Sequence, residues 1–155
     1  MHSGPPVIDP TPIGAPPRPT RVYSVGQMIG ATLLGGPLGG CVLLASNFLL
    51  FGATQRRTQA LVGGVVASVL VMVLGFFLPE RVPDSALPAA YTIALQQLAS
   101  RTQGAEIETF LASGGSKHSH WRVAGIGAAC LAGILAALFA VLLALPEAWL
   151  ESVPE

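Results

Sequence analysis

Gly35-Gly36-Pro37-Leu38-Gly39-Gly40 lies inside the first apolar segment of the chain, which contains no charged side chain from Gly26 to Phe51. A run of about 18 or more apolar residues is long enough to cross a hydrocarbon core roughly 30 Å thick. Proline lacks a backbone donor and clashes with the preceding helical turn, so we predict that the segment is kinked or broken at Gly36-Pro37. Whether the segment crosses the membrane or turns back sets the topology of everything after it.

The composition is typical of a membrane protein. Only 10% of the 155 residues are charged, whereas a soluble domain carries about 25% charged residues to keep its surface wet. We therefore predict an all-α integral membrane protein, a small bundle of about three to four transmembrane helices in contact with the lipid bilayer. The zero net charge gives no electrostatic basis for nucleic-acid binding. Cys41 and Cys130 lie in apolar blocks and are interpreted as reduced packing residues.

The apolar blocks divide the chain into tails and a membrane domain. The predicted parts are a disordered Pro-rich tail (1–22), a helical membrane domain (23–145, with segments at about 25–51, 60–78, 86–103 and 123–145) and an acidic C-terminal tail (146–155). Ser24 and Gln27 have the spacing of a capping box, which predicts a helix start. Gly52 is suited to the left-handed conformation that ends a helix.

The connections between segments carry most of the polar residues. Arg56 and Arg57 are expected in a short basic loop. Gly104 is expected to end the third segment, which leaves a short helix over 105–112 on the membrane surface. Ser113-Gly114-Gly115-Ser116 is expected to break that helix.

Three topologies remain open from the sequence. Lipid favours a kinked full crossing of the first segment, because re-entrant backbone must be shielded by protein; this is our first expectation. The preference of basic residues for the cytoplasmic side favours a segment that turns back at Gly36-Pro37, because only Arg81 would then lie outside. In the third topology, 86–103 lies at the membrane interface and three spans remain.

The sequence contains no recognised catalytic constellation. Ionisable residues, which ion-coupled transport typically requires, are absent well inside the apolar blocks. Asn47 is interpreted as a polar contact between helices inside the membrane. Zinc would need at least one more ligand besides His118 and His120, and the sequence offers none at a suitable spacing. We therefore interpret the two histidines as part of a basic cluster beside Trp121. We predict no enzymatic activity, no cofactor and no metal site.

Small residues at four-residue spacing are the repeated signal. Such spacing places them on one face of a helix, where two backbones can approach closely in lipid. The predicted helix-packing residues are Gly35, Gly36, Gly39, Gly40, Gly63, Gly64, Gly125 and Gly133. Two interpretations stay open: packing inside the bundle, and association with a membrane-protein partner or a second copy.

Several motifs together resemble a set of small, uncharacterised bacterial multi-pass membrane proteins with a Gly-Gly-Pro-Leu first segment. They are Tyr23-Ser24, Ala31-Thr32, Leu34 to Leu38, Asn47, Gly114-Gly115, Ser119-His120-Trp121-Arg122 and Gly125-Ile126-Gly127. The likeness covers about Tyr23 to Leu145. It implies a location in the bacterial inner membrane and carries no mechanism.

Two functions follow as hypotheses. The first is a non-catalytic membrane protein that works by helix packing with a partner, as an accessory subunit or an immunity-type protein. The alternative is a component of a small transporter or pore, with the Gly35–Gly40 break lining a cavity.

Overall fold

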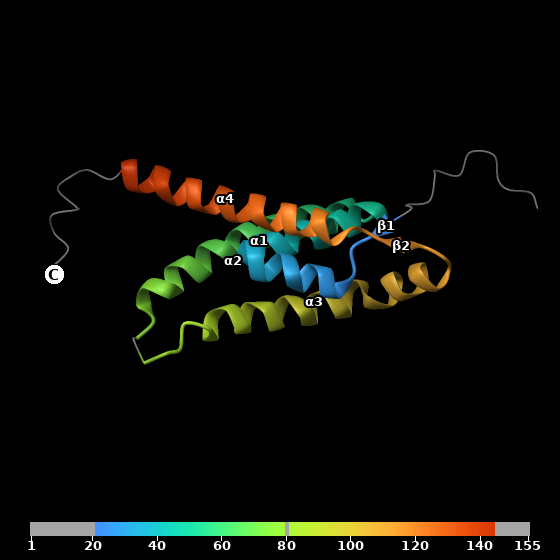
Figure 1. The fold of residues 1–155 in the computed structure, drawn as a ribbon, viewed down its shortest axis with the longest axis horizontal. Coiled ribbons are helices and arrows are strands. Elements are labelled where there is room, and N and C mark those ends of the chain that lie inside the picture. The colour runs from blue at the N-terminus through green and yellow to red at the C-terminus, as the bar shows by residue number, and fades with distance from the viewer. Residues whose placement is uncertain (1–20, 80, 145–155) are drawn as a thin grey trace, which may run out of the picture.

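The structure is a computed structural model that describes residues 21–79 and 81–144, and it confirms the predicted all-α bundle. Its elements are β1 (Arg21–Val22), α1 (Val25–Leu50), α2 (Thr54–Phe77), α3 (Ala86–Ala112), β2 (Ser116–Lys117) and α4 (His120–Ala144) (Figure 1). Residues 21–22, predicted as part of the tail, instead pair in parallel with β2. The rest of the predicted Pro-rich tail and the predicted acidic tail lie outside the described residues.

The helices have the apolar surface of a membrane protein. Three stretches are long and apolar enough to cross a membrane: Val25–Leu50, Thr54–Gly75 and His120–Ala144. Large apolar side chains are exposed along α2 and α4, among them Val62, Val66, Leu70, Leu74, Leu135, Phe139 and Leu143. A soluble monomer rarely exposes so much contiguous apolar surface. Lipid is the medium in which these two helices are stable.

Helix α1 is broken at the predicted position and turns back on itself. In one continuous helix, Tyr23 and Asn47 would lie about 36 Å apart at 1.5 Å per residue. Instead, the Tyr23 backbone N–H donates to Asn47 Oδ1 at 3.0 Å. The two halves of α1 therefore form an antiparallel hairpin, with both ends on the same side of the bundle. This geometry corrects the expectation of a full crossing.

The hairpin turn has a local cause in the sequence. Gly35 and Gly36 leave the helical conformation, and Gly36 has a φ of 62°, a value that side chains with a Cβ rarely adopt. Pro37 then stands at the start of the second half, where its missing N–H costs nothing and its fixed φ suits a helix. The halves, of about ten and about fourteen residues, reach only about 15 and 21 Å, so neither half crosses a bilayer alone.

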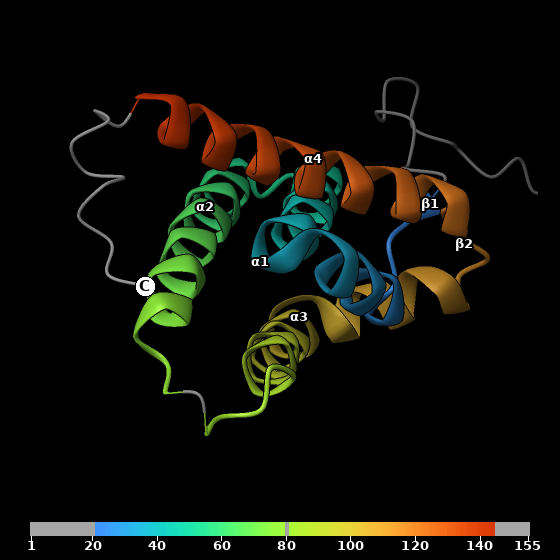
Figure 2. The ribbon, with the colours of Figure 1, turned by 60° about the vertical axis from the view of Figure 1, so that its left-hand side comes forward.

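The other helices surround this hairpin (Figure 2). In the most apolar stretch of α1, 61% of the residues are buried, against 11% for α2 and 6% for α4. The core consists mainly of side chains from α1, such as Met28, Leu43, Leu44 and Phe48. Helix α1 is therefore the shielded centre of the bundle, which is the condition under which re-entrant backbone is tolerated in a membrane.

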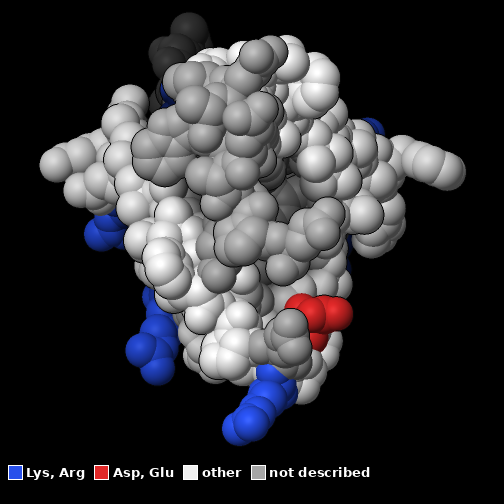
Figure 3. All heavy atoms as spheres, turned by 90° about the vertical axis from the view of Figure 1, so that its left-hand side faces the viewer, with Lys and Arg blue, Asp and Glu red and all other residues white. Residues whose placement is uncertain are grey.

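The order of the elements defines two ends of the bundle. Both ends of the α1 hairpin, the start of α2, the end of α3 and the start of α4 lie together, which we call the basic end (Figure 1). Residues 78–79 and 81–85 and the end of α4 lie at the opposite end, seen in Figure 3, where most of the described surface carries no charge. Helices α2, α3 and α4 each run between these two ends (Figure 1). Of these three, α2 and α4 contain stretches long and apolar enough to cross a membrane.

Two expected boundaries differ from the structure. Arg56 and Arg57 lie within the first turn of α2 rather than in a loop, and α2 begins before the predicted 60–78 segment. Helix α3 continues through Gly104 to Ala112 and does not end near 103. Its buried Leu95, Ala99, Gln103 and Ile107 form one stripe across Gly104, and burying that stripe outweighs the cost of about 1 kcal/mol for a glycine inside a helix.

Other local predictions are confirmed. The Ser24–Gln27 capping box is present at the start of α1. Gly52 follows α1 with a φ of 76°. Helix α3 ends before the 113–116 break, where Gly114 has a φ of 92°. Cys41 and Cys130 are free thiols.

Candidate functional site

Asn47 closes the open end of the α1 hairpin. Its Nδ2 donates to the Tyr23 carbonyl at 2.8 Å, while its Oδ1 accepts from the Tyr23 N–H. Both residues are buried, and the Asn47 side chain is fully inaccessible. The polar contact of Asn47 is therefore made with the backbone that precedes α1, and both the oxygen and the nitrogen of its amide have partners.

The 113–119 connection is fastened to the start of α1. Gln27 Nε2 donates to the His118 carbonyl at 2.6 Å, and the His118 N–H donates to the Val22 carbonyl at 3.0 Å. The His118 ring stacks on Tyr23 with 4.3 Å between ring centroids. These contacts, together with the two short strands, tie the start of α4 to the hairpin.

Helix α3 is joined to the hairpin by a second buried amide. Gln103 Nε2 donates to the Leu44 carbonyl at 2.9 Å, and only 1% of the Gln103 side chain is exposed. Nothing in the sequence distinguished Gln103 from Gln96 and Gln97, which lie on the same predicted segment. Only its position in the stripe at four-residue spacing with Leu95 and Ala99 could have indicated burial.

Five of the predicted packing glycines lie at the turn of the hairpin or at contacts within the bundle. An added methyl group at Gly35 would lie 2.6 Å from the Gly127 carbonyl oxygen of α4, and one at Gly64 would lie 2.6 Å from Cys41 Cβ. At Gly39 it would overlap the Ala31 carbonyl of the opposite half of α1. At Gly40 it would overlap Leu95 of α3 and Thr32. Gly36 forms the turn itself.

These contacts show how α1 meets each neighbour. Gly35 meets α4, Gly40 meets α3, and Cys41 meets Gly64 of α2. Gly127 belongs to the same set, because an added methyl group there would lie 2.9 Å from Leu34 Cβ. The small-residue series through Gly125 and Gly133 did not select Gly127, since it lies on another face of α4.

The remaining three predicted glycines are unused within the described bundle. For Gly63, Gly125 and Gly133, no described atom lies within 4 Å of an added methyl group. On α4, the exposed small residues Gly125, Ala129, Gly133 and Ala137 form a strip, which we call the α4 strip. Five of the predicted glycines therefore pack within the described bundle, and the other three lie on its surface.

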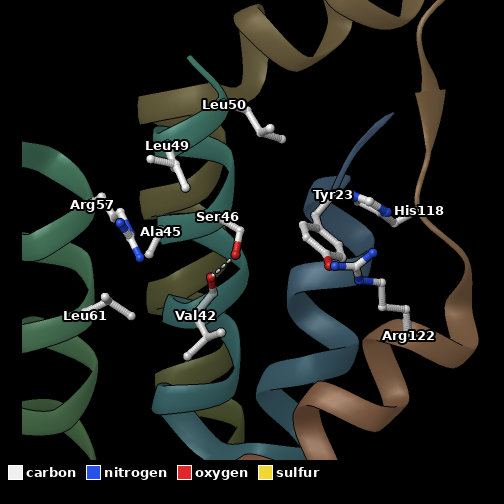
Figure 4. A pocket seen from close by; sticks show the side chains of 10 residues that line it. All are labelled: Tyr23, Val42, Ala45, Ser46, Leu49, Leu50, Arg57, Leu61, His118 and Arg122. Atoms are coloured by element: carbon white, nitrogen blue, oxygen red, sulfur yellow. Dashed lines mark hydrogen bonds between the residues drawn. The ribbon is translucent and has the colours of Figure 1, made fainter. Parts of the chain in front are cut away.

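A groove of about 310 Å³ opens at the basic end between α2, α4 and the hairpin (Figure 4). Arg57 of α2 and Arg122 of α4 approach it from opposite walls, and Ser46 lies between them on α1. The Tyr23–His118 pair forms its upper rim in Figure 4. Burial, with smaller contributions from Arg122 and Arg21, lowers the pKa of His118 and so favours the neutral imidazole.

The histidine pair has no metal-site geometry in the described part of the chain. No group of three His, Cys, Asp or Glu side chains comes together there. His118 faces Tyr23, and His120 is the first residue of α4.

Comparison of the chain with protein-family models, with curated proteins and with solved structures finds no match.

Proposed function

We propose that this protein is a non-catalytic, multi-pass protein of the bacterial inner (cytoplasmic) membrane that acts by packing the α4 strip against a membrane-protein partner. It would serve as an accessory subunit or an immunity-type protein. The observation that carries the proposal is the exposure of Gly125 and Gly133, next to five glycines already used inside the fold. A strip of small residues permits close helix contact in lipid.

The packing of the rest of the bundle supports this proposal. Helix α1 occupies the interior, and its polar side chain Asn47 is fully used in the hairpin. The α4 strip is exposed and can therefore contact a second protein, whereas the buried glycines cannot. The described spans contain no chemistry that would require a substrate to enter the bundle.

The charge distribution supports one orientation. The basic end holds Arg21, Arg56, Arg57, Arg101, Lys117 and Arg122, while Arg81 lies in the opposite connection. Basic residues near span ends favour the cytoplasm. We therefore propose that the basic end is cytoplasmic and that the end of α4 lies on the other side.

The partner hypothesis makes a direct prediction for the α4 strip. Changing Gly125 and Gly133 together to leucine is expected to abolish association while leaving insertion and helical content unchanged, because the strip is exposed and leucine favours both helix and lipid. The protein is purified in mild detergent from its host, and association is measured by light scattering and by the stoichiometry of the co-purified protein.

Gly75→Leu is the matched control for this experiment. Gly75 lies on α2, is exposed, and has no described atom within 4 Å of an added methyl group. It is expected to retain association. The proposal is contradicted if the double α4 variant associates as the parent does, or if Gly75→Leu weakens association equally.

A transporter or pore component is the second candidate. It is favoured by a groove of about 240 Å³ at the hairpin turn, lined by Gly35, Gly36, Pro37, Ser68 and Ile134 among others. Broken helices place substrates at such positions in transporters. Liposome flux that is lost on Ser68→Ala but kept in the α4 double variant would favour this candidate over partner packing.

A further inference from the structure

We propose that the groove between Arg57 and Arg122 binds the phosphate headgroup of an anionic phospholipid. The groove joins two basic side chains from different helices to an apolar wall, and it opens at the end of the bundle where headgroups lie. None of the described residues that line it is acidic. Its charge is therefore complementary to a phosphate diester and to no cationic ligand.

The two arginines supply the headgroup contacts. In Figure 4, Arg57 and Arg122 lie on opposite sides of Ser46, and the Arg122 guanidinium lies beside the Tyr23 ring. Guanidinium groups bind phosphate oxygens through paired, charge-assisted hydrogen bonds. Basic pockets between transmembrane helices on the cytoplasmic side are a general means of recognising anionic headgroups.

The helix ends around the groove add to its positive potential. Arg57 lies in the first turn of α2 and Arg122 in the first turn of α4. These are the positive ends of the two helix dipoles, where arginine is unfavourable and an anion is stabilising. No acidic side chain occupies either first turn, and α2 has no side-chain cap. A bound phosphate would offset the positive charge at the start of α2 and at the start of α4.

The apolar part of the lining favours a lipid over a free phosphate ion as the occupant of the groove. Val42, Leu49 and Leu61 line the groove beside the arginines and offer an apolar surface to an acyl chain. Trp121, which adjoins Arg122 in sequence, is 87% exposed, as expected of an aromatic side chain at the membrane interface. The combination of cations with an adjoining apolar wall matches an amphiphile.

The test uses the full-length protein in zwitterionic detergent with labelled histidines. Short-chain phosphatidylglycerol is titrated while the His118 imidazole resonance is followed, since this ring borders the groove. We expect a saturable shift with phosphatidylglycerol and none with phosphatidylcholine of the same chain length. Arg57→Gln together with Arg122→Gln is expected to weaken the interaction by about tenfold or more, because hydrogen bonds to charged groups are the stronger class.

A charge-matched variant distinguishes binding in this groove from attraction to the general positive charge of the surface. Arg56 and Arg101 line a different groove at the same end of the bundle, so Arg56→Gln with Arg101→Gln removes equal charge and is expected to keep the His118 response. All four arginines are exposed, and unchanged helical circular dichroism checks the fold of both variants.

Three outcomes would overturn the proposal. The first is the absence of a saturable response to phosphatidylglycerol. The second is an equal loss of that response in the Arg56/Arg101 variant, which would mean general surface charge. The third is an equal response to inorganic phosphate at the same concentration, which would assign the groove to a free anion. None of these outcomes bears on association through the α4 strip, so the two proposals fail independently.

Discussion

Gly39→Ala is expected to lower the free energy of unfolding by about 3 kcal/mol, at the upper end of the usual range for overpacking. The added methyl group would overlap the carbonyl oxygen of Ala31 and lie 3.2 Å from its carbonyl carbon. These are backbone atoms of the facing half of α1, so no side chain can rotate away. The two halves would have to separate to admit the methyl group.

Gly30→Ala is the matched control, and its expected effect has the opposite sign. Gly30 lies in the first half of the same hairpin, but no described atom lies within 4 Å of an added methyl group. Alanine there should raise stability by up to about 1 kcal/mol, because it favours the helix over glycine. Both variants are compared by urea or thermal unfolding in the same detergent. Equal effects at the two positions would contradict the close packing of the halves.

Asn47→Leu is expected to cost about 2 to 6 kcal/mol. The substitution removes both hydrogen bonds to the Tyr23 backbone and leaves a buried N–H and a buried carbonyl without their partner. Each unsatisfied buried group costs about 1 to 3 kcal/mol. The loss falls at the open end of the hairpin, so we also expect faster backbone hydrogen exchange around Tyr23.

Thr32→Val controls for the loss of a buried hydrogen bond as such. Thr32 is fully buried, and its hydroxyl donates to the Met28 carbonyl of its own helix. That carbonyl keeps its helical partner when the hydroxyl is removed, so the expected cost is below about 1 kcal/mol. If Asn47→Leu were as mild as Thr32→Val, the side chain of Asn47 would not hold the hairpin closed.

The sequence was sufficient for the features that depend on local chemistry. Charge depletion predicted the membrane class, the Ser24–Gln27 spacing predicted a helix start, and Gly36-Pro37 predicted a break. The capping box and the break each depend on residues a few positions apart. The structure places both where they were expected.

The direction of the chain after the break could not be predicted locally. A Gly-Gly-Pro interruption fits a kinked span as well as a hairpin, and the choice depends on Asn47 reaching Tyr23, 24 residues away. The need to shield re-entrant backbone from lipid favoured a full crossing, whereas the distribution of basic residues favoured the hairpin. The charge argument agreed with the structure because it reports on the positions of whole segments.

The same limit applies to α3 and to the glycines. Gly104 is a reasonable helix end by propensity, but the buried stripe that passes it is stabilised by α1 and carries the helix onward. Four-residue spacing places small residues on one face without saying what covers that face. Gly40 is covered by Leu95, while Gly125 and Gly133 have no described neighbour within 4 Å.

The central claim is that α1 turns back, so that both of its ends lie on one side of the membrane. Cysteine is introduced singly at Arg21, Gln55 or Ser85, all exposed positions, in a chain with Cys41 and Cys130 changed to alanine. A membrane-impermeant thiol reagent is applied to either side of sealed membranes. The hairpin predicts that positions 21 and 55 are labelled from one side and position 85 from the other. Labelling of positions 21 and 55 from opposite sides would show that α1 crosses the membrane and would contradict the account.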